Sequence, residues 1–326
     1  MKKRDSFGSK IGAVLVAAGS AIGLGSIWRF PYMTGENGGG AFLLVSLLCV
    51  IIVGIPVMLA EFAIGTHTRK SPVKAYNQFS PRWKWLGYNS VVVSLLISGF
   101  YYIVAGWSLE YFVSSINGSL YSAADFHQHF AAFTSSWRQP IYTLIFILLT
   151  HAVVVMGVQK GLERISKIVM PVLLLMLIVL VVHSATMSGA AEGYRFLFQP
   201  DFSKAFSIKT IVSAIGQAFF SLSIGLGCMI AYSSYFKEGT NLTHTSISVS
   251  LMTFFVAMLS GMVIFPAVFS VEGLEPTAGP TLLFETLPFI FAEMPAPQLW
   301  SAIFFLLVAL AALTSTISFH EVLTQY

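Results

Sequence analysis

Charged residues are scarce in this sequence, because Asp, Glu, Lys and Arg together make up 10% of its 326 residues. Soluble domains carry about 25%, so the composition excludes an ordinary water-soluble protein. Hydrophobic residues reach 56%, and the net charge of +4 gives no indication of nucleic-acid binding. The composition therefore predicts an all-α polytopic protein in a lipid bilayer.

Cysteine is nearly absent, and Cys49 and Cys228 both lie in long apolar stretches, which argues against a disulfide framework. A cleavable signal peptide is also missing, since no small-residue cleavage site precedes Arg29. No nucleophile–base arrangement or metal-ligand spacing is present. We therefore expect no enzymatic activity and no organic cofactor; the rival in that class is an intramembrane enzyme using His151, His183 or Glu61.

Apolar stretches of about 20 residues, the length that crosses a bilayer, recur along the chain. We predict eight spans, at approximately 11–35, 40–66, 86–116, 140–158, 165–187, 208–236, 243–271 and 298–324. Lys and Arg concentrate before the first span and in alternate loops, above all Arg69, Lys70, Lys74, Arg82 and Lys84. This positive-inside bias predicts a multi-pass protein of the inner (plasma) membrane with a cytoplasmic N-terminus.

The tetrapeptide Ile-Gly-Leu-Gly occurs twice, at 22–25 and 224–227, each time inside a predicted span. Glycine costs a helix about 1 kcal/mol relative to alanine, so both sites are predicted helix breaks. Backbone groups freed at membrane depth need partners, and a bound ion and substrate can supply them. Matching breaks predict inverted repeats, at 1–187 and 188–326, the second incomplete with three spans. The alternative is that the glycines only allow close helix packing.

The first break suits two kinds of ligand. The helix that restarts near Gly25 and Ser26 presents unsatisfied N–H groups, which favour a carboxylate. Carbonyl groups released between Gly19 and Ile22 suit a hard cation such as sodium.

Several segments resemble the neurotransmitter:sodium symporter family. They are 17–32, 36–42, Gly54-Ile55-Pro56, Tyr101-Tyr102 and 216–223. The resemblance implies an inverted-repeat fold with helices 1 and 6 unwound at mid-membrane, and sodium-coupled amino-acid symport by alternating access. Family members have about four further helices, so we expect this chain to be truncated after the eighth. A truncated, non-transporting amino-acid-binding or sensor protein is the alternative.

The resemblance also implies a substrate site. The carboxylate would meet Leu24, Gly25 and the hydroxyl of Tyr102. The remaining substrate positions are Ala21, Ser98, Phe220, Ser221, Ser223, Leu226, Ser315 and Phe319. This set is apolar with a few hydroxyls, so we expect a hydrophobic or aromatic amino acid. The particular amino acid and the oligomeric state stay open.

Two sodium sites follow from the same resemblance. One would use the carbonyls of Gly19, Ile22 and Ala311 and the hydroxyls of Thr314 and Ser315. Alternatively, the hydroxyls bond carbonyls of their own helix. The other site would involve Ala21, Ser26, Ser221 and Thr253; it is expected to be weakened or absent, because hydroxyls replace the amide or carboxylate oxygens typical of the family.

Two charged residues inside the spans need an explanation. The resemblance assigns Arg29 to an external gate assisted by Gln217, whereas the alternative is a snorkelling arginine. We expect Glu61 to hydrogen-bond backbone exposed by the breaks. His151 and His183 are isolated in sequence and are expected to be packed or interfacial. Phe7 and Arg4 occupy positions that the family uses at its cytoplasmic gate.

Overall fold

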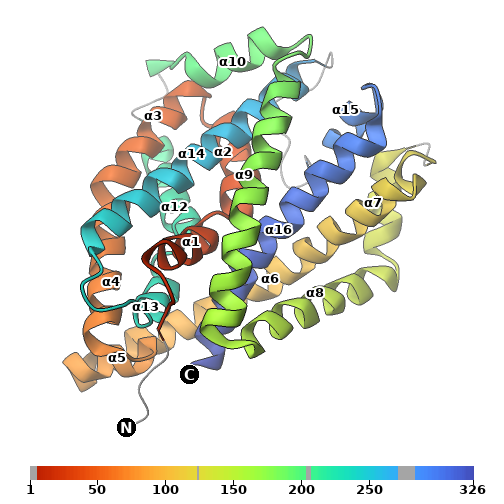
Figure 1. Ribbon diagram of the computed structural model, residues 1–326. Coiled ribbons are helices and arrows are strands. Elements are labelled where there is room, and N and C mark those ends of the chain that lie inside the picture. Colours follow the sequence, from red (N-terminus) through yellow and green to blue (C-terminus); the bar gives the residue numbers. More distant parts are fainter. Residues whose placement is uncertain (1–5, 123–124, 203–206, 271–282) are drawn as a thin grey trace.

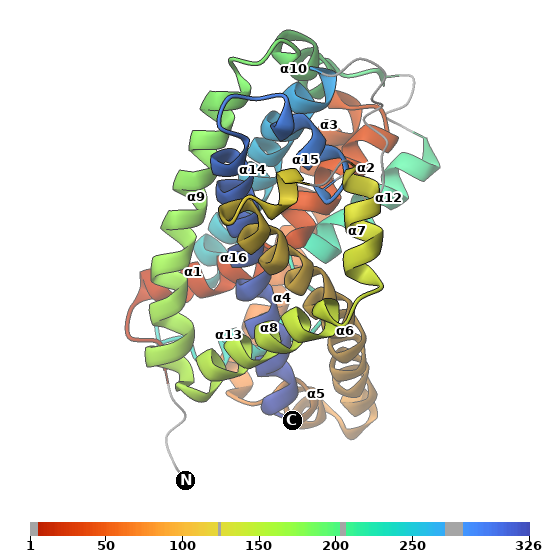
Figure 2. The same ribbon diagram turned by 90° about the vertical axis from the view of Figure 1, so that its right-hand side faces the viewer.

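The computed structural model describes residues 1–326 except 1–5, 123–124, 203–206 and 271–282. Within the described residues every regular element is a helix. The helices form one elongated bundle (Figure 1). The C-terminus and α5 (Pro72–Phe79) lie at one end, and α10 (Ala190–Phe198) and α15 (Thr286–Ala292) lie toward the other (Figure 2).

Six helical segments are individually long and apolar enough to cross a membrane. They are α3–η2–α4 (Gly40–Thr68), η3–α6 (Pro81–Ile116), α8 (Arg138–Val155), η5–α9 (Val158–Ser184), α14 (Leu242–Phe269) and α16 (Pro297–Thr324). They correspond to six of the eight predicted spans, with boundaries shifted by a few residues. Two short helices, η4 (Ser119–Ser122) and α7 (Phe126–Thr134), follow α6.

The other two predicted spans are each divided. The first consists of α1 (Lys10–Ala21) and the segment η1–α2 (Gly25–Glu36), bent by 53° relative to each other. The second consists of α12 (Ile208–Ser221) and α13 (Cys228–Ser233), each too short to cross a bilayer alone. Among the described residues, six helices and one bent pair are long and apolar enough to cross a membrane, and the count of eight spans stays a prediction.

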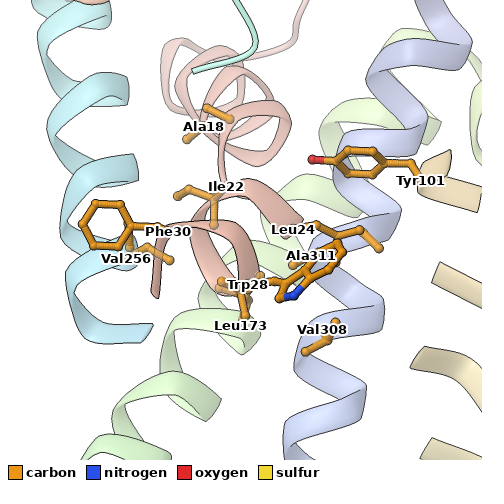
Figure 3. Close-up of a cluster of buried hydrophobic side chains, with 14 of the residues drawn as sticks. Ala18, Ile22, Leu24, Trp28, Phe30, Tyr101, Leu173, Val256, Val308 and Ala311 are labelled. Atoms are coloured by element: carbon orange, nitrogen blue, oxygen red, sulfur yellow. The ribbon is translucent and has the colours of Figure 1, made fainter. Parts of the chain in front are cut away.

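The first break lies at the centre of the core. Ile22, Leu24 and Trp28 are buried there. They are surrounded by Tyr101 of α6, Leu173 of α9, Val256 of α14, and Val308 and Ala311 of α16 (Figure 3). α16 also packs against α6, α8 and α9. The irregular segment is therefore enclosed by continuous helices.

Outward-facing surfaces of the long helices are apolar. Leu95 and Leu96 on α6 and Leu144 and Leu148 on α8 are each more than half exposed. Such surfaces suit lipid and would be unusual for a soluble monomer. The chain is a multi-pass membrane protein; the repeat boundary at 187/188, between α9 and α10, stays a prediction.

Candidate functional site

The first break has a defined backbone path. α1 ends at Ala21, and Ile22 and Gly23 leave the helical pattern before η1 begins at Gly25. The Ser26 and Ile27 N–H groups both donate to the Gly23 carbonyl, at 3.1 and 3.2 Å. A side chain at Gly23 would collide with the Ser315 hydroxyl on α16. Glycine is therefore needed here for close approach of the two segments.

The second break is more strongly distorted. Ser223, Gly225 and Gly227 have φ values of +52°, +81° and +79°. Glycine adopts this left-handed conformation without steric cost, whereas Ser223 does not. The strain at Ser223 is held in place by its hydroxyl, which donates to the Ser20 carbonyl at 2.9 Å.

Polar side chains of neighbouring helices satisfy the backbone of the second break. Glu61 of α4 accepts from the Gly225 N–H at 2.6 Å. Ser94 of α6 donates to the Leu226 carbonyl at 2.7 Å. The expectation that Glu61 binds backbone freed by a break is confirmed, and its buried carboxylate has a structural role.

The two breaks meet at the Ser20 carbonyl. It accepts hydrogen bonds from Ser223 at 2.9 Å and from Ser315 of α16 at 3.2 Å. Ser20 lies between Gly19 and Ile22, where the sequence predicts released carbonyl groups. Its own carbonyl could not be singled out, because a backbone oxygen carries no residue-type signal.

The structure brings together the residues of the first predicted sodium site. Thr314 donates to the Ile22 carbonyl at 3.4 Å and to the Ala311 carbonyl at 2.9 Å. A side chain at Gly19 would lie 3.4 Å from Thr314 Cβ. Both predicted uses of the Thr314 hydroxyl are therefore present: a bond within its own helix and a contact with the break.

The residues of the second predicted sodium site are more dispersed. Ser26 donates to the Ala21 carbonyl at 3.4 Å, and Thr253 donates within its own helix to Val249. Ser221 and Thr253 line a cavity of about 20 Å³, which has room for about one water molecule. The polar side chains that line this cavity are Ser46, Gln217, Ser221 and Thr253, and none of them is a carboxylate.

The structure places the two adjacent tyrosines of α6 in different surroundings. The predicted substrate residue Tyr102 has its hydroxyl 3.2 Å from His320 Nδ1. Tyr101 faces the first break (Figure 3). Adjacent residues on an α-helix differ by about 100° in direction, so the two side chains cannot both face the break.

Aromatic rings surround Tyr101. The Phe319 and Phe220 ring centroids lie 5.1 and 6.0 Å from its own. Phe220 also covers Gly25, since a side chain there would lie 2.8 Å from Phe220 Cδ1. Ser98 is buried, with its hydroxyl bonded to Leu95 of its own helix. Phe220 and Phe319, two of the predicted substrate residues, therefore lie beside Tyr101, and the substrate pocket itself stays a prediction.

The predicted external gate residues are in contact. Arg29 donates to the Gln217 side chain at 2.6 Å, and Gln217 donates to the Gly25 carbonyl at 2.8 Å. The Arg29 guanidinium also lies 5.1 Å from the centre of the Phe220 ring. These contacts direct Arg29 into the protein, so the snorkelling alternative is wrong.

At the opposite end, Phe7 is fully buried against Tyr235 and Phe236. Its N–H donates to the Tyr235 carbonyl at 3.0 Å. Glu163 holds the adjacent segment through the N–H groups of Gly8 and Ser9, at 2.5 and 3.1 Å. Arg4 lies outside the described residues.

The two singled-out histidines differ, since His183 is half-buried and His151 is exposed on α8. His183 stacks on Trp300 with ring centroids 3.8 Å apart. His151 lies 3.1 Å from His320 across α8 and α16, a pairing that their separation in sequence concealed. Among the described residues, no group of three or more His, Cys, Asp or Glu could hold a metal ion.

Comparisons with known proteins agree with this architecture. Residues 4–129 and 131–325 match the Sodium:neurotransmitter symporter family. An uncharacterized sodium-dependent transporter of Bacillus subtilis, YhdH, is 43% identical over 99% of this chain and 72% of its own length. An uncharacterized sodium-dependent transporter of Haemophilus influenzae is 36% identical over 99% of this chain and 73% of its own.

A solved structure gives the same result. The crystal structure of MhsT in complex with L-phenylalanine superposes with a TM-score of 0.91 at 42% identity. The similarity covers 98% of this chain and 74% of MhsT. These relatives are transporters and not enzymes. The chain belongs to the sodium:neurotransmitter symporter family of membrane transport proteins.

Proposed function

We propose that this protein transports a hydrophobic or aromatic amino acid together with sodium by alternating access. The observation that carries the proposal is the meeting of both broken segments with α16 at the Ser20 carbonyl. Two interrupted helices then present oxygen atoms and N–H groups to one buried region. A continuous helix offers neither, because its backbone groups are paired internally.

Sodium would bind among the carbonyls of Gly19, Ile22 and Ala311 and the hydroxyls of Thr314 and Ser315. Support comes from the contacts of Thr314 with both Ile22 and Ala311. The ion would thereby tie α1 to α16 across the first break. The site formed by Ala21, Ser26, Ser221 and Thr253 would be weak, since it contains no carboxylate.

The amino-acid carboxylate would bind at Leu24 and Gly25, where η1 begins, with Tyr101 as the hydroxyl donor. Tyr101 thus takes the role of carboxylate ligand that the sequence resemblance assigns to Tyr102. The side chain of the substrate would lie among the remaining pocket residues, chiefly Phe220 and Phe319, with Ser98, Ser223 and Leu226 nearby. Aromatic lining favours an aromatic or large aliphatic substrate, and the L-phenylalanine bound by the related MhsT is consistent with this.

Transport would follow from differential binding. Sodium and the amino acid would shift the population between outward-facing and inward-facing forms by binding them with different affinity. The contact between Arg29 and Gln217 would form the external gate. The contact between Phe7 and Tyr235 would form the gate on the cytoplasmic side. We place the protein in the inner (plasma) membrane with the N-terminus in the cytoplasm.

Reconstituted vesicles test this function. Labelled amino acids are presented with an inward sodium gradient, and matched vesicles carry potassium instead. Accumulation of phenylalanine, leucine or a related amino acid only with the sodium gradient is the expected result. Binding without accumulation would instead identify a non-transporting binding or sensor protein.

A further inference from the structure

We propose that a pocket at the end of the bundle that carries the C-terminus binds the phosphate group of an anionic lipid headgroup or of free phosphate. The pocket has a volume of about 270 Å³ and lies between the start of α5 and the start of α6. Its polar lining includes Ser71, Lys74, Asn77, Lys84 and Tyr88. None of these residues belongs to the ion and amino-acid site described above.

A buried hydroxyl without a partner points to a ligand. Ser71 is 4% exposed, it lines the pocket, and its Oγ has no hydrogen-bond partner among the described residues. Ser71 precedes α5 as its N-cap but makes no capping bond to it. A buried hydroxyl with no partner destabilises the folded state, and a bound anion would accept its hydrogen bond.

The start of α5 adds donors beside that hydroxyl. Pro72 occupies the first helical position and has no N–H, so the N–H groups of Val73 and Lys74 are the free donors of the first turn. A helix N-terminus carries partial positive charge, which favours an anion. Together with Ser71 Oγ, these groups match the several acceptor oxygens of one phosphate.

Two lysines supply full positive charge. Lys74 and Lys84 both line the pocket, and neither forms an ion pair within the part of the chain that the structure describes. The Lys84 ammonium lies 5.2 Å from the centre of the ring of Tyr88, which also lines the pocket. In the sequence, no acidic residue occurs between Glu61 and Glu110, whereas five cations lie between 69 and 84.

The surroundings of the pocket match a lipid interface. Phe79, Trp83 and Trp85 are each more than half exposed next to it in sequence. Aromatic side chains of this kind gather at headgroup level, and basic pockets beside membrane helices bind anionic headgroups. Pro72 also packs on Gly227, because a side chain at Gly227 would lie 2.9 Å from Pro72 Cγ. The bound phosphate would therefore sit directly beside the second break.

Native mass spectrometry of the purified full chain tests the proposal without requiring transport. Phosphatidylglycerol, phosphatidylcholine and inorganic phosphate are titrated against wild type, Lys74→Gln/Lys84→Gln and Lys70→Gln/Arg82→Gln. The last variant loses the same charge outside the pocket. We expect Lys74→Gln/Lys84→Gln to bind phosphatidylglycerol about tenfold more weakly than wild type does. The control Lys70→Gln/Arg82→Gln should bind it nearly as tightly as wild type. Lys74→Arg/Lys84→Arg keeps both positive charges and should also bind it like wild type.

The remaining outcomes are also decisive. Loss of bound phosphatidylglycerol on addition of phosphate would identify free phosphate as a ligand of the site, and retention would identify the lipid headgroup. Ser71→Ala should weaken whichever ligand binds, whereas Ser80→Ala should not. The proposal would be overturned if all variants bound phosphatidylglycerol equally, or if both double variants lost the same affinity for it. Tighter binding of phosphatidylcholine than of phosphatidylglycerol would also overturn it.

Discussion

The Glu61 carboxylate on α4 accepts a hydrogen bond of 2.6 Å from the Gly225 N–H, in the middle of the second helix break. Glu61 lies inside α4 and is 5% exposed, whereas Gly225 lies between the end of α12 and the start of α13. The acidic side chain thus replaces the helical partner that Gly225 lacks. Glu61 therefore stabilises the second break, and we do not include it among the proposed substrate ligands.

Replacing Glu61 tests this role. Glu61→Leu should lower the free energy of unfolding by about 1–3 kcal/mol, because the Gly225 N–H would lose its acceptor on Glu61. Glu61→Gln retains an acceptor oxygen and should lose much less. Thermal unfolding of the purified variants in detergent measures the difference. Equal stability of Glu61→Leu and wild type would contradict the structural role.

Tyr101 and Tyr102 form a matched pair of variants. Tyr101→Phe removes a hydroxyl expected to bind a carboxylate, a hydrogen bond worth about 1.5–3 kcal/mol, so amino-acid affinity should fall about ten- to hundredfold. Tyr102→Phe removes a hydroxyl that contacts His320, and this variant should bind the amino acid nearly as wild type does. Equilibrium binding of labelled amino acid distinguishes them. The opposite ranking would restore Tyr102 as the substrate ligand.

Gly25→Leu should abolish amino-acid binding. Even its Cβ would lie 2.8 Å from the Phe220 ring, and the rest of the side chain would fill the proposed carboxylate position. Gly216→Leu on α12 is the control, since nothing lies within 4 Å of an added Cβ there. Scintillation proximity binding provides the measurement. Unchanged affinity of Gly25→Leu would remove Gly25 from the site.

The contact between His127 on α7 and Glu285 should depend on pH. Their hydrogen bond, 3.1 Å long, raises the pKa of His127 above its ordinary value. The contact therefore stabilises the folded protein below the ordinary pKa of about 6.5, and this contribution is lost as pH rises through the raised pKa. Hydrogen exchange of α7, corrected for intrinsic rates, should show more protection at about pH 5 than at about pH 8. His127→Gln should abolish the difference; its persistence in this variant would exclude the pair as the cause.

Much of the fold could be predicted from the sequence, because the bilayer imposes strong limits. Long apolar stretches located the helices, and the repeated Ile-Gly-Leu-Gly marked both breaks. The second break shows what such reasoning misses. The glycines marked its place at 224–227, but the break begins earlier, where Ser223 takes a left-handed conformation that its residue type does not indicate.

The site was less predictable, because it depends on the direction of individual side chains. Tyr101 and Tyr102 are equally apolar and adjacent, so only the helix rotation decides which one faces Phe319. The Ser20 carbonyl and the His151–His320 pair depend on contacts between distant segments. By contrast, Glu61 was recognisable, since a lone buried acid beside two breaks has few other partners.

The central claim is that the two breaks and α16 hold sodium together with the amino acid. Its most direct test is the sodium dependence of amino-acid binding in Thr314→Val, compared with Thr316→Val, whose hydroxyl contacts Thr150 instead. We expect Thr314→Val to require about tenfold more sodium than wild type for half-maximal amino-acid binding, whereas Thr316→Val should require as much as wild type. A sodium titration that is unchanged by Thr314→Val would contradict it.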